Sequence, residues 1–263
     1  MKVVLFCGGL GMRLREYSET IPKPMVRIGN HPILWYLMKY YASYGHTDFI
    51  ICLGYRGEVI KQFFLNYSEY MSNDFTMSNG GLEKHIYHTD IHDWTITFAE
   101  TGQHANIGQR LKTVERYLEG EEVFMANYAD GLTDLPLDRY LEFFRSQDKT
   151  ASFVAVRPRH TFHIVEMDPQ AQVTNVQHVE KSVWINGGFF IFKREILDQI
   201  HNGEELVDEP FRRLIGRRQL LGYQYDGFWE CMDTFKDKQS FDEMYERGYT
   251  PWVVWDKSRK EGK

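Results

Sequence analysis

Short apolar runs bounded by turn residues alternate with segments of helical period through most of the chain. This alternation is typical of parallel strands covered by helices, and it predicts an α/β fold. The apolar runs predict strands over Val3–Phe6, Phe49–Leu53, Thr95–Ala99, Val123–Asn127, Ala151–Val156 and Trp184–Phe192. The segments of helical period predict helices over Ile33–Tyr44, Glu58–Asn66, Gln109–Leu118, Leu137–Ser146, Glu209–Ile215 and Phe235–Arg247.

Two stretches depart from this pattern. Between Asn66 and Trp94 the chain is polar and weakly periodic, and it is too long for an ordinary connection, so we expect a functional or subunit-contacting excursion there. Beyond about Ala151 the pattern shortens to strand–turn–strand units, such as Phe162–Glu166 followed by Gln172–Gln177. We therefore expect one domain over 1–263, made of a larger part at 1–150, a smaller β-rich lobe at 151–255 on the same sheet, and a charged tail at 256–263.

Composition and charge limit the classes of protein to which this chain can belong. With 263 residues, 43% of them apolar, the chain can bury a large core. Its net charge of −6, with no stripe of Lys and Arg, argues against a nucleic acid as partner. Cys7, Cys52 and Cys231 lie in or beside apolar runs without metal-ligand spacing, so we expect reduced thiols and a cytoplasmic protein. Met1–Lys2 leads straight into a strand, and no apolar run approaches the roughly 20 residues that span a bilayer, so we expect neither a signal peptide nor a membrane helix.

A glycine-rich turn follows the first predicted strand, in the segment Cys7-Gly8-Gly9-Leu10-Gly11-Met12-Arg13-Leu14. Three glycines let the backbone turn tightly and direct successive N–H groups at an anion, which indicates a phosphate-binding loop. A dinucleotide-binding fold opens in the same way, but it calls for an acidic residue at the end of the second strand, where this chain has Cys52-Leu53-Gly54-Tyr55. Two cations follow the glycines, Arg13 and then Lys23 between two prolines that stiffen the backbone. The alternatives are a surface ion pair for Arg13 and an exposed loop position for Lys23.

Two remote aspartates complete the candidate chemistry. Asp130 follows the strand Val123–Asn127, at the edge of the sheet where open α/β folds bind ligands, and Asp233 precedes the last predicted helix. Magnesium prefers one or two carboxylates together with phosphate oxygens and water, so this sparse pair suits a Mg²⁺ ion that arrives with a nucleotide. The alternatives are a turn role for Asp130 beside Gly131 and a helix N-cap role for Asp233.

Together these motifs resemble the sugar-1-phosphate nucleotidyltransferase family. The resemblance rests on Gly8-Gly9-Leu10-Gly11-Met12-Arg13-Leu14, Pro22-Lys23-Pro24-Met25, Asp130-Gly131, Asn186-Gly187-Gly188-Phe189-Phe190 and Met232-Asp233-Thr234. Within the family the chain looks most like the glucose-1-phosphate cytidylyltransferases, through Gly108-Gln109-Arg110-Leu111-Lys112, Gly227-Phe228-Trp229 and Pro251-Trp252.

The resemblance implies a Rossmann-like, mixed and mostly parallel sheet flanked by helices, as in nucleotidyltransferases and related GT-A-like folds. It implies that the part at 1–150 binds the nucleotide and the part at 151–255 the acceptor, with CTP as donor, a sugar phosphate as acceptor and a homo-oligomeric enzyme. It places Arg13 and Lys23 at the reacting phosphates and Mg²⁺ between Asp130 and Asp233. The implied nucleotide contacts are Gly8, Gly9, Leu10, Gly11, Met12, Gly108, Arg110 and Asp130, and the implied sugar contacts are Asn186, Gly187 and Gly188.

Two departures from the family pattern matter. Met12 stands where the family often has Ser or Thr, so this loop has backbone donors and Arg13 but no hydroxyl for the phosphate. The family's Glu-Lys-Pro acceptor motif is missing, because Glu180-Lys181 lacks the proline and lies closer to Asn186. The acceptor phosphate is therefore expected on Lys181 or on Arg157 and Arg159, whose guanidinium groups suit phosphate.

An acceptor phosphate has a second pKa of about 6, so it is mostly dianionic at neutral pH and attacks phosphorus without a protein base. The hypothesis is therefore nucleotidyl transfer by positioning and charge neutralisation. The alternatives are cytidylyl transfer to another phosphorylated acceptor, a non-catalytic nucleotide-binding relative and, more remotely, a dehydrogenase. Arg13, Lys23, Asp130 and Asp233 are all retained, which argues against the non-catalytic relative.

Overall fold

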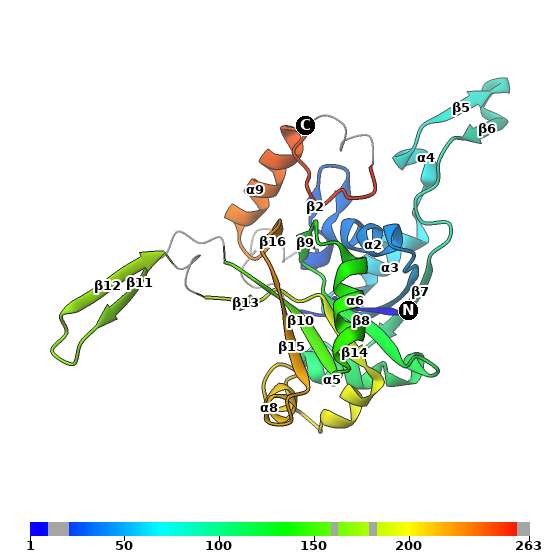
Figure 1. Cartoon of the computed structure of the whole chain (residues 1–263). Coiled ribbons are helices and arrows are strands. Elements are labelled where there is room, and N and C mark those ends of the chain that lie inside the picture. The colour runs from blue at the N-terminus through cyan, green and yellow to red at the C-terminus, as the bar shows by residue number, and fades with distance from the viewer. Residues whose placement is uncertain (10–20, 159–162, 179–182, 257–263) are drawn as a thin grey trace.

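The protein is built around one mixed sheet with helices on both faces (Figure 1). The computed structural model describes residues 1–9, 21–158, 163–178 and 183–256. Seven strands follow one another across the sheet in the order β13-β10-β14-β8-β1-β4-β7, and β15 pairs with β10. Their bounds, in chain order, are β1 Val3–Phe6, β4 Asp48–Leu53, β7 Thr95–Glu100, β8 Val123–Tyr128, β10 Ala151–Val156, β13 Ile185–Asn186, β14 Phe190–Lys193 and β15 Leu220–Tyr225.

The centre of the sheet is parallel. β1 pairs in parallel with β4 on one side and with β8 on the other, so that Val3 lies opposite both Phe49 and Met125. β14 runs antiparallel to β8 and to β10, so it is a reversed strand between two strands that share one direction. The predicted mixed, mostly parallel α/β sheet is confirmed.

Side-chain alternation along each strand divides the interior into two cores. Val3 and Leu5 of β1 belong to one core, and Val4 and Phe6 belong to the other. The first core packs under α2 (Ile33–Ser43), α3 (Gly57–Leu65), α6 (Leu137–Gln147) and α9 (Phe235–Glu246). The second packs under α5 (Ile107–Thr113), η4 (Glu115–Leu118), η5 (Arg194–Gln199) and α8 (Glu209–Gly216). Among the described residues, no helix is long and apolar enough to cross a membrane.

Two sequence predictions of elements need correction, and strand β15 was missed. The helix predicted over 109–118 begins earlier, at Ile107, and is divided into α5 and η4. The strand predicted over 184–192 is split into β13 and β14, because Gly188 takes a positive φ between them. Strand β15 was not predicted, since its sequence LLGYQY has a glycine inside and its burial alternates only weakly.

Two antiparallel hairpins project from opposite sides of this body (Figure 1). The first lies in the stretch between α3 and β7, where α4 (Glu69–Ser72) is followed by β5 (Phe75–Ser78) and β6 (Glu83–Ile86). The second joins β11 (His163–Met167) to β12 (Val173–His178), close to the strand–turn–strand unit that the sequence predicts. The remaining short pairs are β2 (Arg27–Ile28) with β3 (His31–Pro32), and β9 (Gly131–Thr133) with β16 (Trp229–Cys231).

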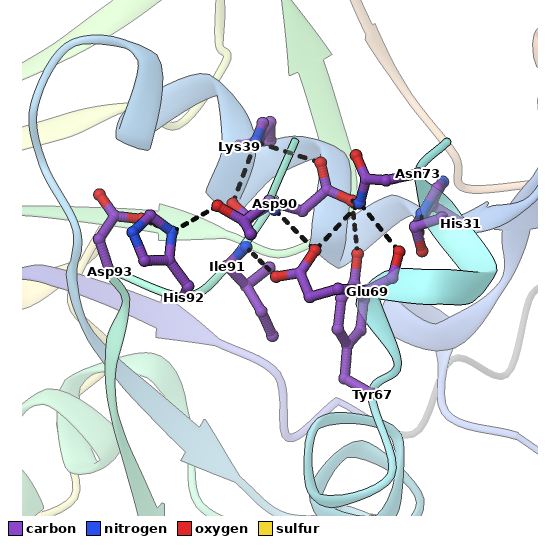
Figure 2. Close-up of polar contacts among 11 residues, drawn as sticks. His31, Lys39, Tyr67, Glu69, Asn73, Asp90, Ile91, His92 and Asp93 are labelled. Carbon is purple, nitrogen blue, oxygen red and sulfur yellow. Dashed lines mark hydrogen bonds and ion pairs between the residues drawn. The ribbon is translucent and has the colours of Figure 1, made fainter. Parts of the chain in front are cut away.

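The base of the first hairpin is fastened by a polar network (Figure 2). The Glu69 carboxylate accepts hydrogen bonds from the backbone N–H groups of Asp90 and Ile91, at 2.7 and 3.0 Å. The Asp90 carboxylate accepts from Asn73 and from the Tyr67 hydroxyl, both at 2.9 Å, and the Lys39 ammonium of α2 donates to the Asp90 carbonyl at 3.0 Å. The two ends of the excursion are therefore tied to each other and to helix α2.

We predict that Glu69→Ala loosens this base without unfolding the sheet. The substitution leaves the partly buried N–H groups of Asp90 and Ile91 without the Glu69 acceptor, and because water can replace part of the bond the cost is at most about 1–3 kcal/mol per group. Native-state hydrogen exchange at these two amides should accelerate accordingly. Glu83→Ala is the matched control, because the Glu83 carboxylate bonds only exposed Ser78 and Asn79 side chains at the hairpin. Unchanged exchange in Glu69→Ala would show that the network does not fix the base.

Candidate active site

A cavity of about 470 Å³ opens at the carboxyl ends of the central strands. It is lined by residues at or after the ends of β1, β7 and β8 and by residues of η2 (Lys23–Met25). The segment before α9 and Glu205 complete the lining. The lining residues are Phe6, Cys7, Gly9, Lys23, Pro24, Ala105, Asn106, Ile107, Arg110, Tyr128, Ala129, Asp130, Glu205 and Asp233. This edge of a parallel sheet is where ligands of open α/β folds bind.

Lys23 enters the cavity from a rigid backbone. Pro22 precedes the single turn η2 with extended torsions, and Pro24 occupies its second position. The turn closes through hydrogen bonds from Met25 N to Pro22 O at 2.8 Å and from Val26 N to Lys23 O at 3.1 Å. Because Pro24 and Met25 are buried, the backbone at Lys23 is fixed and its side chain is directed inward.

The Lys23 ammonium lies between two carboxylates. Its Nζ is 2.6 Å from Oδ2 of Asp130 and 2.5 Å from Oδ1 of Asp233, and the Lys23 side chain is only 14% exposed. Burial disfavours the charged amine, but the two carboxylates outweigh that effect and raise the pKa of Lys23 above its usual value. Lys23 is therefore a fixed cation at neutral pH.

Short strand pairing holds the two aspartates together. β9 follows Asp130 and pairs with β16, which precedes Asp233, and Met232 N donates to Asp130 O at 2.8 Å. The N-cap of α9 is Thr234, in a capping box with Asp237. The N-cap role considered for Asp233 is therefore wrong, and its carboxylate turns toward Lys23 instead of the helix end.

Behind this pair, Asp134 fastens the strand that leads to Asp233. Its Oδ1 accepts a hydrogen bond from Phe228 N at 2.8 Å and another from the Tyr225 hydroxyl. The Thr133 hydroxyl donates to Phe228 O at 2.7 Å. Both main-chain groups of Phe228 are thus used to position the turn into β16.

The two carboxylates fit a divalent cation. Their oxygens already converge on one positive centre, the Lys23 ammonium, and carboxylate oxygen is a preferred ligand of Mg²⁺. Within the described ranges, no three His, Cys, Asp or Glu side chains gather as a metal-binding group. A metal held by Asp130 and Asp233 would therefore need phosphate oxygens and water to complete its coordination.

Arg110 joins three loops beneath the cavity. From α5, its guanidinium donates to Gly8 O after β1 at 3.0 Å, to Leu53 O at the end of β4 at 3.2 Å, and to Gly102 O after β7 at 2.9 Å. It also donates to the Thr101 hydroxyl at 2.7 Å. Burial lowers the pKa of Arg110, yet a guanidinium keeps its charge in proteins, so a positive charge lies under the glycine turn.

Close packing on Arg110 explains two of the glycines. A Cβ at Gly8 would lie 2.0 Å from Arg110 Nη1, and a Cβ at Gly54 would lie 2.8 Å from the same atom. Any larger residue at these positions would displace the guanidinium from the carbonyls. Gly8 is thus required by the packing of its own loop, whatever ligand the loop binds.

Comparison with known proteins identifies the family. The model of the family described as Nucleotidyl transferase matches residues 2–236. The chain is 38% identical to the glucose-1-phosphate cytidylyltransferase of Salmonella typhi, over 97% of this chain and all of that protein. This chain belongs to the nucleotidyl transferase family. The resemblance inferred from the motifs is confirmed.

More distant relatives of this nucleotidyl transferase are named for other nucleotides and sugars. The mannose-1-phosphate guanyltransferase of Gibberella zeae is 26% identical, over 90% of this chain and 62% of that protein. A solved structure of UDP-glucose pyrophosphorylase complexed with UDP-glucose superposes with a TM-score of 0.68 at 16% identity, covering 94% of this chain and 98% of the other. The latter likeness confirms the fold of the family.

The predicted site residues fall into three groups. The cavity brings together Gly9, Lys23, Arg110, Asp130 and Asp233, and Gly8 adjoins it through Arg110. Other predicted residues lie outside the described part of the chain: Leu10, Gly11, Met12, Arg13, Arg159 and Lys181. The third group does not line the cavity: Gly108, Arg157, Asn186, Gly187 and Gly188.

The third group is nevertheless placed by specific contacts. A Cβ at Gly108 would meet Glu204 O at 2.3 Å, so this glycine allows α5 to pack against the segment before α8. Asn186 Oδ1 accepts from Gly188 N at 2.9 Å, and Gly187 O accepts from the Trp229 indole at 2.9 Å. Arg157 pairs with Asp226 at 3.0 Å and lies over the Trp184 ring.

Sequence reasoning missed three polar residues of the cavity, Asn106, Tyr128 and Glu205. Asn106 caps α5 in a capping box with Gln109, and the spacing of these two residues could have revealed it. Glu205 accepts a hydrogen bond from Ile107 N at 3.3 Å across the cavity wall. No local pattern marks Glu205, because it comes from a remote turn.

We predict that Arg110→Met disorganises the loops after β1, β4 and β7 that Arg110 joins beneath the cavity. Several buried oxygens lose their donor, so the free energy of unfolding should fall by about 3 kcal/mol or more. Chemical denaturation measures this loss. Arg116→Met is the control, since Arg116 is exposed on the following turn η4 and should change stability by less than about 0.5 kcal/mol. Equal losses of stability from the two substitutions would show that the hydrogen bonds of Arg110 to the three loops do not stabilise the fold.

Proposed function

We propose that this enzyme transfers a cytidylyl group from CTP to glucose 1-phosphate, giving CDP-glucose and pyrophosphate. The Salmonella relative, whose whole length the chain covers at 38% identity, supports this pair of substrates. The structural observation that carries the proposal is the meeting of Lys23, Asp130 and Asp233 beside a cavity at the carboxyl edge of the sheet. A triphosphate needs such a combination of a fixed cation and two metal-binding carboxylates.

In the proposed reaction a phosphate oxygen of the acceptor attacks the α-phosphorus of CTP. The new phosphorus–oxygen bond forms as the bond from the α-phosphorus to the oxygen bridging it to the β-phosphate breaks, and pyrophosphate takes the electron pair. The acceptor phosphate is mostly dianionic at neutral pH, with a second pKa of about 6, so no side chain has to remove a proton. The protein has to align the two anions and neutralise their charge.

Lys23 is the residue that we assign to the reacting phosphates. Its backbone is fixed by two prolines, and its flexible four-carbon stem reaches the cavity. The ammonium could therefore stay close to the negative charge on the phosphates as substrate becomes product. We assign the outgoing phosphates to Arg13 and the backbone of Gly8, Gly9, Leu10, Gly11 and Met12.

Asp130 and Asp233 are the residues that would hold a metal, and we propose Mg²⁺. When bound, this cation would neutralise charge on the donor phosphates. Arg110 would support the nucleotide from below through the loops that it joins, and Gly108 through the packing of α5.

The acceptor is assigned to the edge of the sheet next to β8. Asn186 ends β13, which pairs with β10, and Gly187 and Gly188 lead from it toward β14, where the Gly188 backbone packs against Asn127 of β8. For the acceptor phosphate we propose Lys181, with Arg157 and Arg159 as the alternative.

We predict that pyrophosphate release is fastest with CTP and glucose 1-phosphate. A matrix of four nucleoside triphosphates against several phosphorylated acceptors, read by product mass, measures this. Lys23→Ala should lower turnover about 10²-fold or more, by analogy with the loss of one preorganised donor. Lys61→Ala is the control, because Lys61 pairs with Glu100 on the surface and should leave turnover unchanged. No product from any pair of substrates would support a non-catalytic relative instead.

We also propose that the enzyme is a cytoplasmic homo-oligomer. Cys7, Cys52 and Cys231 form no disulfide, which suits a reducing compartment. Isolated two-stranded hairpins are marginally stable in water, yet both projecting hairpins expose apolar side chains. The first, together with the preceding helix α4, exposes Met71, Met77, Leu82 and Tyr87, and the second exposes Val165, Met167, Val173 and Val176. Contact with other subunits would cover these surfaces.

We predict that the double substitution Met71→Ser and Leu82→Ser, which replaces side chains that are 86% and 89% exposed, weakens the oligomer. Light scattering coupled to size exclusion should show a smaller species at a given concentration. Ile215→Ser, at an exposed position of α8, is the control and should leave the mass unchanged. A wild-type chain that is monomeric at assay concentration would contradict the proposal.

A further inference from the structure

The pair Asp130 and Asp233 holds a cation without any metal. Both carboxylates contact one atom, the Lys23 Nζ, at 2.6 and 2.5 Å. Lys23 comes from the turn η2, Asp130 from the end of β8 and Asp233 from the segment before α9, so three separate parts of the backbone place these groups together. The charge of the two aspartates is thus balanced in part by a side chain of the protein itself.

A divalent ion and this ammonium cannot occupy the same position. Mg²⁺ binds oxygen at about 2.0–2.1 Å, so an ion held by the same two oxygens, Oδ2 of Asp130 and Oδ1 of Asp233, would lie in the volume that Nζ now fills. Even a displaced ammonium nearby would repel the ion, and the low exposure of Lys23 limits screening by water. Binding of a metal to these two oxygens therefore requires the Lys23 side chain to move away from Asp130 and Asp233.

Another anion in the adjoining cavity would compete with the two carboxylates for the Lys23 ammonium. The backbone of Lys23 is fixed by Pro22 and Pro24, but its side chain has four rotatable carbon–carbon bonds. A polyphosphate in the adjoining cavity offers oxygens that bind an ammonium as well as a carboxylate does. The same polyphosphate carries oxygens that complete the coordination of a metal.

We propose that Lys23 is the resident counter-ion of the Asp130–Asp233 pair, and that it excludes free divalent cations until a polyphosphate draws it away. The ligand of this site is then the metal–nucleotide complex, and metal and nucleotide bind in a mutually dependent way. This inference rests on the proposed function, because it assigns a polyphosphate to the cavity.

Binding of Mn²⁺ to the whole chain, measured by the loss of its free electron paramagnetic resonance signal, tests the proposal. Without nucleotide, the wild-type chain should bind Mn²⁺ at least about tenfold more weakly than the variant Lys23→Met, in which the two carboxylates are left without the ammonium. Addition of CTP should restore Mn²⁺ binding to the wild-type chain, seen as a loss of free Mn²⁺ signal larger than the same CTP causes without protein. In thermal unfolding without nucleotide, Mn²⁺ should raise the Tm of Lys23→Met and leave that of the wild type unchanged.

Two further variants show where the metal binds. Lys39→Met breaks the contacts of Lys39 with Asp90 at the base of the first hairpin (Figure 2), far from the cavity lining, and should bind Mn²⁺ as the wild type does. Lys23→Met combined with Asp233→Asn removes one carboxylate as well, and it should lose the gain in Mn²⁺ binding.

Tight binding of Mn²⁺ to the wild-type chain without nucleotide would overturn the proposal, whether or not Lys23→Met folds. Equal Mn²⁺ affinity of the wild type and Lys23→Met would overturn it too. Failure of the proposed function looks different. In that case CTP would not restore Mn²⁺ binding to the wild-type chain, and no substrate pair would release pyrophosphate.

Discussion

The ion pairs of one lysine with two aspartates connect the parts of this molecule that matter for its chemistry. Lys23 lies near the start of the chain, and its partners Asp130 and Asp233 are far away in sequence. Carboxylates at such close range repel each other, so their approach depends on a cation between them. The strands of the sheet, the hairpin pairing of β9 with β16 and the two prolines beside Lys23 all contribute to this one contact. The fold thus fixes the backbone positions at which these opposite charges meet, while the Lys23 side chain keeps the freedom to exchange partners.

A second cation organises the opposite side of the same cavity in another way. Arg110 contacts uncharged oxygens of the loops after β1, β4 and β7, and so joins the ends of three neighbouring parallel strands. Lys23 is neutralised by carboxylates, whereas the charge of Arg110 is compensated only by dipoles within the described residues. A polyanion in the cavity would therefore meet one cation that must exchange partners and one that stays in place. This difference suits a site that has to bind a charged substrate and then release a charged product.

The sequence was sufficient for the features that depend on local pattern. Short apolar runs bounded by turn residues predicted β1, β4, β7, β8 and β10, because buried parallel strands are continuous apolar runs. The motifs predicted that Lys23, Asp130 and Asp233 would surround one metal-bound polyphosphate, and the structure brings these three side chains together. Features that depend on the third dimension were not accessible. Arg110 joins its three loops through backbone carbonyl oxygens, which any residue supplies. Glu205 reaches the cavity from a turn that has no distinctive sequence pattern.

A crystal structure of the chain with CTP and Mg²⁺ is the most direct test of this account. We expect the metal on Asp130 and Asp233, and the Lys23 Nζ within hydrogen-bonding distance of a phosphate oxygen instead of between the carboxylates. A nucleotide bound elsewhere, with Lys23 still between the two aspartates, would contradict the account.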